Sequence, residues 1–118
     1  SELLARVRAL LRRAQPERVE SLRFADLVLD PEERSCRRGE RQIELTRREF
    51  DLLEKLVINA RTTMSRWQLI DDVWDGAIDL DSNTLEVYVG YLRKKLEAGG
   101  EPRLVHTVRG VGYVVREA

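Results

Sequence analysis

One stretch near the C-terminus carries side chains whose types and spacing suit contact with DNA. If residues 84–98 form an α-helix, steps of about 100° per residue divide them between two faces. One face combines a hydroxyl, a branched apolar group, phenols and an ammonium: Thr84, Val87, Tyr88, Tyr91 and Lys95. This mixture matches the methyl groups, base acceptors and phosphates that line DNA grooves. The other face is a narrow apolar stripe that predicts packing on a core: Leu85, Val89, Leu92 and Leu96.

A short hairpin follows this helix. Residues 104–108 and 113–115 are typical of two β-strands, and Arg109 lies in the glycine-containing bend between them. A helix followed by an outward hairpin with a basic tip indicates a winged helix. The guanidinium of Arg109 is then placed to enter a minor groove, where the electrostatic potential is most negative.

Three sequence strings carry a resemblance to a known family. They are NTLEVYV at residues 83–89, LRKKL at 92–96 and TVRGVGY at 107–113. Together they resemble the effector domain of OmpR/PhoB-type bacterial response regulators, over nearly the whole chain from residue 22 to residue 116. The resemblance implies a sequence-specific DNA-binding transcriptional regulator of a two-component system. It places the recognition helix 84–98 in the major groove and the wing around Arg109 in the minor groove.

The DNA contacts that we expect combine side-chain chemistry with this resemblance. They are Asn83, Thr84, Val87, Tyr88, Tyr91, Arg93, Lys95, Thr107, Arg109, Trp74 and Arg66. Asn83 and Thr84 open the helix, where unpaired N–H groups attract phosphate, and Val87 suits a thymine methyl. The basic residues and Thr107 suit phosphates. The resemblance implies that the indole N–H of Trp74 faces the DNA backbone, and an ordinary core tryptophan is the alternative.

Two positions depart from the family pattern. Many members carry arginines where this chain has Gly90 and Tyr91, so bidentate readout of guanine from position 91 is lost. Binding then relies more on shape and apolar contact. Trp67 stands in the first turn of its helix, where a polar residue is usual. It either covers the start of the helix or contacts a partner.

Start signals place three helices ahead of the hairpin. In a capping box, a residue at the helix start and one three residues later satisfy each other's backbone N–H groups. The predicted boxes pair Thr46 with Glu49, Ser65 with Gln68, and Asn83 with Glu86. Short alternating segments separated by turns predict antiparallel strands at 22–24, 27–29, 35–37 and 42–45. The expected fold class is α+β: a winged helix-turn-helix with a small N-terminal four-stranded antiparallel sheet, three helices and a C-terminal β-hairpin wing.

The remaining segments flank this unit. Residues 1–15 carry apolar side chains at helical spacing, and the segment resembles the last helix of a receiver domain. We expect residues 16–21 to be a linker and residues 22–118 to be the winged-helix domain. A helix that belongs to the domain itself is the alternative for residues 1–15. The resemblance also implies that Asp75, Asp79 and Asp81, in the loop between the second and third helices, contact RNA polymerase. A merely solvated loop is the alternative.

The charge balance supports a second function. The formal net charge is zero, which counts against a nucleic-acid binder if taken alone. It favours a winged-helix protein-interaction module without intrinsic DNA specificity. However, residues 62–82 hold five aspartates and one arginine, whereas residues 83–116 hold six basic and three acidic residues. The proposed contact elements therefore lie in the basic part.

Several classes of protein are disfavoured. The single cysteine, Cys36, excludes an internal disulfide and is compatible with the reducing cytoplasm, which is the location that we expect. Cys36 with His106 is a poor candidate for a nucleophile and base, and one cysteine with one histidine predicts no metal cluster. No apolar run approaches the roughly 20 residues of a membrane span. We expect no enzyme activity, cofactor or membrane association.

The partners follow from the resemblance. They are double-stranded DNA, bound by a dimer at direct repeats, and RNA polymerase. A cognate sensor kinase would act on a receiver domain that this sequence does not contain.

Overall fold

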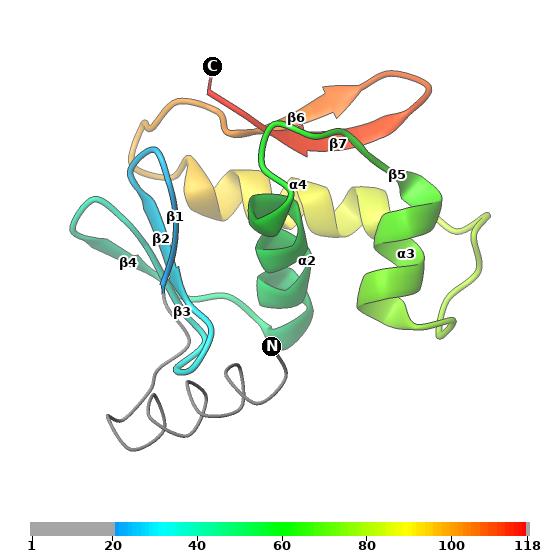
Figure 1. The fold of residues 1–118 in the computed structure, drawn as a ribbon, viewed down its shortest axis with the longest axis horizontal. Helices are drawn as coiled ribbons and strands as arrows, with labels where there is room; N and C mark the ends of the chain where they lie inside the picture. The colour runs from blue at the N-terminus through cyan, green and yellow to red at the C-terminus, as the bar shows by residue number, and fades with distance from the viewer. Residues whose placement is uncertain (1–20, 118) are drawn as a thin grey trace, which may run out of the picture.

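The computed structural model describes residues 21–117 (Figure 1). The helix expected within residues 1–15 and the linker residues 16–20 lie outside the described residues. In chain order, a four-stranded sheet is followed by three helices and then by a hairpin. The expected α+β winged-helix class is confirmed.

The first sheet consists of β1 (Leu22–Phe24), β2 (Leu27–Asp30), β3 (Ser35–Arg38) and β4 (Arg41–Ile43), paired antiparallel in that order. Successive strand residues point to opposite faces, and one face is buried with Phe24, Leu27, Leu29, Cys36 and Ile43. All four predicted strands are present. The second and the third each run one residue further than predicted, and the fourth runs from 41 to 43 instead of 42 to 45. Residues 39 and 40 alone therefore make the turn between them.

Two of the three predicted capping boxes are confirmed. Helices α2 (Arg47–Ile58) and α3 (Arg66–Trp74) begin with the reciprocal bonds of Thr46 with Glu49 and of Ser65 with Gln68. The third box is wrong. Helix α4 (Thr84–Leu96) ends two residues earlier than predicted, and the Asn83 side chain makes no capping hydrogen bond.

The start of α4 is organised by a different residue. The Ser82 hydroxyl accepts a hydrogen bond from the backbone N–H of Thr84 at 3.4 Å and lies 3.1 Å from the Thr84 hydroxyl. Glu86 is not available for a capping box, because its carboxylate binds Arg66. Ser82 caps the helix start and Arg66 binds the Glu86 carboxylate, so the capping box that the sequence predicted does not form.

The second sheet has one strand that the sequence did not indicate. Strands β6 (Val105–Val108) and β7 (Gly112–Val115) form the predicted hairpin, and β5 (Met64–Ser65) pairs with β7 on its other side. Two residues are too few to show a period. The backbones approach so closely that a Cβ atom added to Gly112 would lie 1.9 Å from the carbonyl oxygen of Met64.

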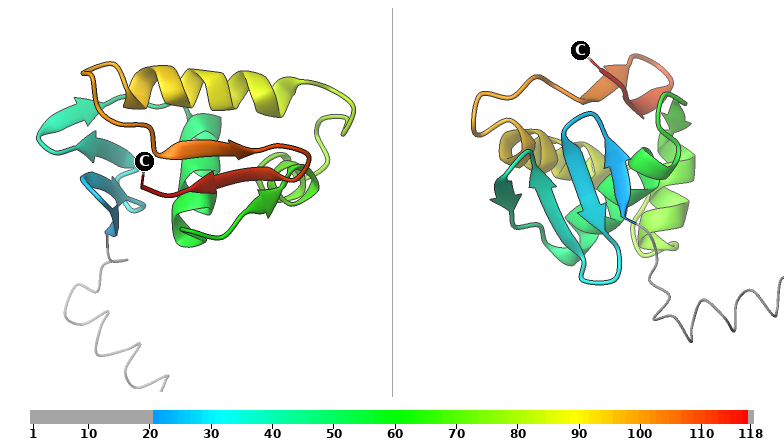
Figure 2. Two further views of the ribbon diagram at one scale, coloured as in Figure 1. Left: turned by 90° about the horizontal axis from the view of Figure 1, so that it is seen from above. Right: turned by 60° about the vertical axis from the view of Figure 1, so that its left-hand side comes forward.

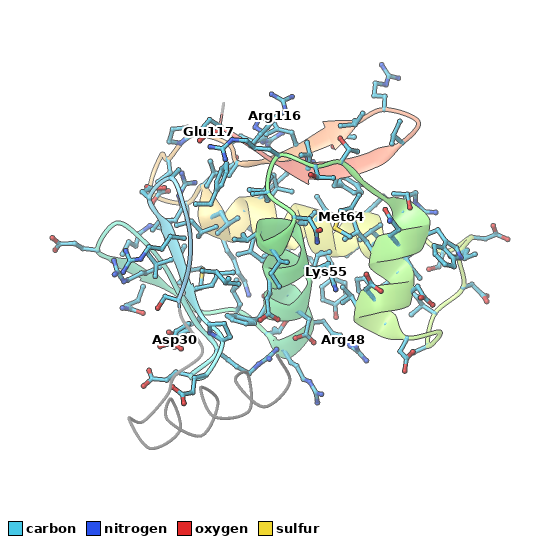
Figure 3. The ribbon with its side chains drawn as sticks, in the orientation of Figure 1. Asp30, Arg48, Lys55, Met64, Arg116 and Glu117 are labelled. Atoms are coloured by element: carbon cyan, nitrogen blue, oxygen red, sulfur yellow. The ribbon has the colours of Figure 1, made fainter. Side chains whose placement is uncertain are left out.

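The helices fill the space between the two sheets. The apolar stripe of α4 is buried as predicted, and α2 buries Phe50, Leu52, Leu53, Leu56 and Val57 in the same core. The hairpin runs alongside α4 in both Figure 1 and Figure 2. Polar contacts also tie α2 to α3: the Lys55 ammonium lies 3.5 Å from the Asp72 carboxylate, and Arg48 donates to the carbonyl of Val73 (Figure 3). These contacts hold α3 against α2, in the same core that buries the apolar stripe of α4.

Replacing Gly112 and Gly90 by alanine should have opposite effects on stability. Gly112→Ala forces β5 and β7 apart and should lower the free energy of unfolding by about 2 kcal/mol or more. Gly90 lies in α4 with open space around it, so Gly90→Ala should raise that free energy by up to about 1 kcal/mol through helix propensity. Urea denaturation of both variants measures the difference. Equal stability of the two variants would contradict the close approach of β5 and β7.

Candidate nucleic-acid interface

The outer face of α4 has exposed side chains at its centre, and aromatic rings pack against one of them. Val87 and Tyr91 are 37% and 49% exposed. The Tyr88 ring lies between those of Tyr91 and Trp74, with centroids 5.6 and 5.3 Å away and edge-to-face angles of 74° and 65°. Such edge-to-face pairs are favourable beyond their buried area. The three rings therefore form a support that fixes where Tyr91 stands.

Trp74 belongs largely to the core. Only 4% of this residue is exposed, and its ring packs against the partly buried Tyr88. The structure thus gives it the packing role that the sequence left open as an alternative. A contact between its indole N–H and DNA stays a prediction.

The hairpin is joined to α4 through one arginine. The guanidinium of Arg93 donates to the carbonyl of Val105 at 2.9 Å and to the Thr107 hydroxyl at 2.6 Å. It also lies 5.9 Å from the centre of the Tyr113 ring. Two residues that were each expected to contact phosphate are therefore bonded to each other. Because the Thr107 oxygen accepts from Arg93, its O–H remains able to donate to another group.

Arg109 stands at the exposed end of the hairpin. Gly110 adopts a left-handed conformation with φ of +77°, and the turn closes with a bond from the N–H of Val111 to the carbonyl of Val108 at 2.9 Å. Among the described residues, the Arg109 guanidinium has no hydrogen-bond or ion-pair partner. Its charge is available to a ligand.

Lys95 has a partner within the domain. Its ammonium lies 2.6 Å from the carboxylate of Glu49, which is 3% exposed and also accepts the backbone N–H of Thr46. Lys95 is only partly exposed as a result, whereas its neighbour Lys94 is exposed. The sequence analysis did not include Lys94 among the contacts, although it follows Val87 by seven residues, close to two helical turns, and so lies on the same face.

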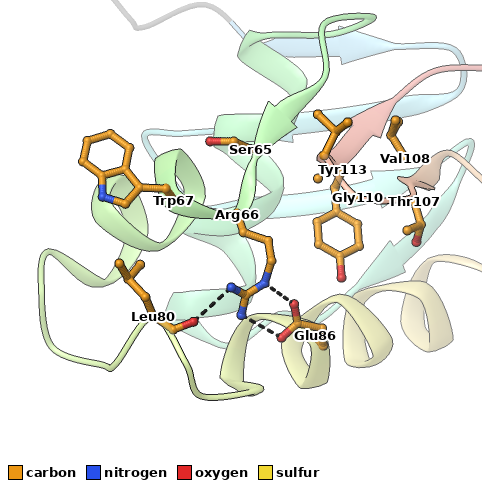
Figure 4. Close-up of a pocket in the computed structure, with 11 residues that line it drawn as sticks. Ser65, Arg66, Trp67, Leu80, Glu86, Thr107, Val108, Gly110 and Tyr113 are labelled. Carbon is orange, nitrogen blue, oxygen red and sulfur yellow. Dashed lines mark hydrogen bonds and ion pairs between the residues drawn. The ribbon is translucent and has the colours of Figure 1, made fainter.

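Arg66 holds the loop between α3 and α4. Its guanidinium bonds the Glu86 carboxylate at 2.5 and 3.2 Å and the carbonyl of Leu80 at 2.9 Å (Figure 4). It also bonds the carbonyl of Ser82 at 2.9 Å. Hydrogen bonding to Arg66 lowers the pKa of Glu86 below its ordinary range. The sequence indicated a phosphate contact for Arg66 and gave no sign of this role, since the partners lie 14 to 20 residues away.

A cleft of about 520 Å³ opens between Arg66 and the hairpin. Its wall includes Trp67, Leu80 and Val111, whose apolar side chains are all exposed, and Figure 4 shows Trp67 projecting beyond the start of α3. Trp67 is 59% exposed and therefore does not serve as a buried cover for the helix start.

The acidic loop presents its carboxylates to solvent. Asp75 ends α3 in a left-handed conformation, and Asp75, Asp79 and Asp81 are all exposed. The carbonyl of Asp79 accepts hydrogen bonds from the N–H and the hydroxyl of Ser82. The hydrogen bonds of this loop thus use the Asp79 backbone carbonyl, and the aspartate carboxylates face solvent.

The groups considered for other chemistry lie in ordinary surroundings. Cys36 is buried in β3, and burial raises the pKa of its thiol to about 11, so it stays protonated at neutral pH. The His106 ring donates to the carbonyl of Arg103 at 3.1 Å. Within residues 21–117, no three His, Cys, Asp or Glu side chains lie together as metal ligands, and no helix is long and apolar enough to cross a bilayer.

Sequence comparison finds response regulators. Residues 39–115 match the family described as "Transcriptional regulatory protein, C terminal". The chain is 57% identical over 119 residues to the response regulator MprA of Mycobacterium tuberculosis, an alignment that covers 98% of this chain and 52% of that protein. MprA of Mycobacterium avium is 56% identical with the same coverage. The chain spans about half the length of the curated relatives it matches.

Solved structures of similar domains share the fold. The DNA-binding domain of Klebsiella pneumoniae RstA, in complex with the RstA box, has a TM-score of 0.73 at 30% identity and covers 82% of this chain and 97% of that one. The DNA-binding domain of CpxR from E. coli has a TM-score of 0.73 at 28% identity, with coverages of 85% and 99%.

Proposed function

This chain belongs to the OmpR/PhoB-type family of response-regulator effector domains, and from that premise we propose that it binds specific DNA sequences through α4 and the β6–β7 wing. One observation carries the proposal. The bonds from Arg93 to Val105 and Thr107 fix α4 against the wing, and Val87, Tyr91 and Arg109 are all exposed on these two joined elements. A DNA duplex offers a major groove that admits a helix and an adjacent minor groove that a wing tip can enter.

In the major groove, α4 supplies the base contacts. The Val87 methyls suit a thymine methyl, and the Tyr91 hydroxyl can donate to a base acceptor or accept from an amino group. Asn83, Thr84 and Tyr88 lie toward the helix start and on the same side, where they suit phosphate or a base edge. Loss of the usual arginine at position 91 makes readout by Tyr91 less specific for guanine.

Phosphates are contacted by the joint between α4 and the wing. Burial lowers the pKa of Arg93, but a guanidinium is not deprotonated in proteins, so Arg93 stays positively charged. The O–H of Thr107 beside it can donate to a phosphate oxygen. The Lys95 ammonium, which is bonded to Glu49, is a further phosphate contact. Trp74 acts mainly by packing against Tyr88. At the wing tip, Arg109 enters the minor groove, where its unpaired guanidinium meets the strongest negative potential.

The wider assignments are also proposals. Two domains bind direct repeats as a dimer, the carboxylates of Asp75, Asp79 and Asp81 contact RNA polymerase, and a sensor kinase acts on a receiver domain of the whole protein. The location is cytoplasmic. The family is one of transcription regulators, and we propose that this domain has no catalytic activity. The protein-interaction alternative is not favoured, because a relative at 30% identity is a DNA-binding domain solved with its DNA box.

Duplex binding should weaken steeply with salt. Three phosphate or minor-groove contacts, from Arg93, Lys95 and Arg109, should give log K a slope of about −2 to −3 against log salt, at about −0.9 per contact. Arg66→Met should weaken binding by loosening the loop but leave this slope unchanged, because its donors are used within the domain. Fluorescence anisotropy with a labelled duplex measures both. A flat response of the wild type refutes DNA binding, and a slope reduced by about 0.9 in Arg66→Met would make Arg66 a phosphate contact after all.

Arg109→Ala and Tyr91→Ala should differ in kind. The Arg109 variant should bind many sequences more weakly and lose preference for narrow A·T-rich minor grooves. The Tyr91 variant should change preference at one or two base pairs by about 1–3 kcal/mol each. Selection from a random duplex library, run with both variants and the wild type, separates the two outcomes. Identical, sequence-independent losses would show that Tyr91 does not read bases.

A further inference from the structure

The last turn of α4 is held by two arginines of the four-stranded sheet. The final carbonyls of a helix have no partner within the helix. Here the Leu96 carbonyl accepts from Arg38 at 3.1 Å and from Arg41 at 3.2 Å, and the Lys95 carbonyl accepts from Arg41 at 3.1 Å. These contacts join residues that are 54 to 58 positions apart in the chain. We name Arg38 and Arg41 the clamp.

Arg38 is buried to an unusual degree for a charged residue. Its side chain is 1% exposed, although a guanidinium is rarely removed from water unless every donor is paired. Two of its nitrogens bond Asp26 at 3.0 and 3.1 Å, and the third bonds the carbonyls of Leu96 and Pro102. The burial therefore commits Arg38 to one position, against the end of α4.

Arg41 makes the arrangement more unusual. It lies directly opposite Arg38 in the β3–β4 register, and like charges in that relation repel each other. The repulsion is offset because both guanidiniums meet the partial negative charge at a helix C-terminus. Arg41 also bonds Glu101 at 2.7 Å, and this bond lowers the pKa of Glu101 to about 2. The C-terminus of α4 thus explains why two arginines can lie opposite each other in this sheet.

The clamp lies one turn from the proposed reading surface. Tyr91 precedes Lys95 by four residues, close to one helical turn, and Lys95 is itself bonded to Glu49 of α2. A helix transmits a small change of tilt at one end to side chains further along. The position of the last turn therefore affects the orientation in which α4 holds Tyr91 and Val87, in addition to the contact of the Tyr91 ring with Tyr88.

We propose that Arg38 and Arg41 are positioning residues for DNA recognition: through them the four-stranded sheet sets the orientation in which α4 presents Val87 and Tyr91 to the major groove. This inference rests on the proposed function of α4. Arg38 is too buried to contact DNA. Its effect should therefore appear in discrimination between sequences and not in the general attraction to phosphate.

The test compares Arg38→Met and Arg41→Met with Arg37→Met in the full 118-residue chain. Arg37 is a matched control, because it lies in the same strand, carries the same charge and bonds the Gly39 carbonyl within its own turn. Affinity is measured for a duplex that the wild type selects from a random library, and for a scrambled duplex of the same length. Both are measured over a range of salt, at a temperature where circular dichroism shows each variant folded.

The clamp variants should lose about tenfold in affinity for the selected duplex and less than about twofold for the scrambled one. The salt slope should be unchanged, and Arg37→Met should affect both duplexes equally. Arg38→Lys, which keeps the charge but not the planar fork, should fall between Arg38→Met and the wild type. If Arg38→Met does not fold, the more exposed Arg41 and the Arg38→Lys variant decide.

The two proposals fail in different ways. If the wild type selects no sequence and binds without salt dependence, the proposed function fails. If the wild type discriminates and Arg41→Met and Arg38→Lys keep the same ratio of selected to scrambled affinity, the clamp does not position α4 and this inference alone is overturned.

Discussion

Burial of one face of α4 constrains the rest of the domain. Leu85, Val89, Leu92 and Leu96 fill the space between the two sheets, and each such side chain contributes roughly 1.5–3 kcal/mol when fully buried. With that face fixed inward, the opposite face must point outward. The polar contacts then set the details: Arg66 bonds Glu86 near the first turn, Arg93 bonds the wing, and the clamp holds the last turn.

The internal use of charge also accounts for a DNA-binding surface on a chain with zero net charge. Many basic side chains of the described residues are paired with an acid of the same domain, as in Arg38 with Asp26 and Arg41 with Glu101. Such pairs nearly cancel at a distance. The carboxylates of the loop between α3 and α4 are exposed, and among residues 21–117 Arg109 of the wing and Lys94 of α4 have no ion-pair partner. Local charge and not net charge governs the encounter with DNA.

Much of the fold could be predicted because its signals are local. Strands β1 to β4, the capping boxes of α2 and α3 and the apolar stripe of α4 all follow from residues a few positions apart. The two-residue strand β5 shows no period, and the box expected at Asn83 was displaced by Ser82 and by the bond of Glu86 to Arg66. Periodicity placed the outward face of α4, and the glycine-containing bend between two strands placed the tip of the wing. The roles of Arg66, Arg38 and Arg41 could not be predicted, because an arginine can bond partners that are distant in the chain. The residues next to it in the sequence do not indicate which partners those are.

Backbone NMR of the ¹⁵N-labelled domain, titrated with its selected duplex, tests most directly whether α4 and the wing form one DNA surface. The account predicts amide shift changes that saturate together along residues 83–95 and 107–110, with little change in β1 and β2. Changes centred instead on Trp67 and Leu80, or on the four-stranded sheet, with α4 and the wing tip unaffected, would contradict it.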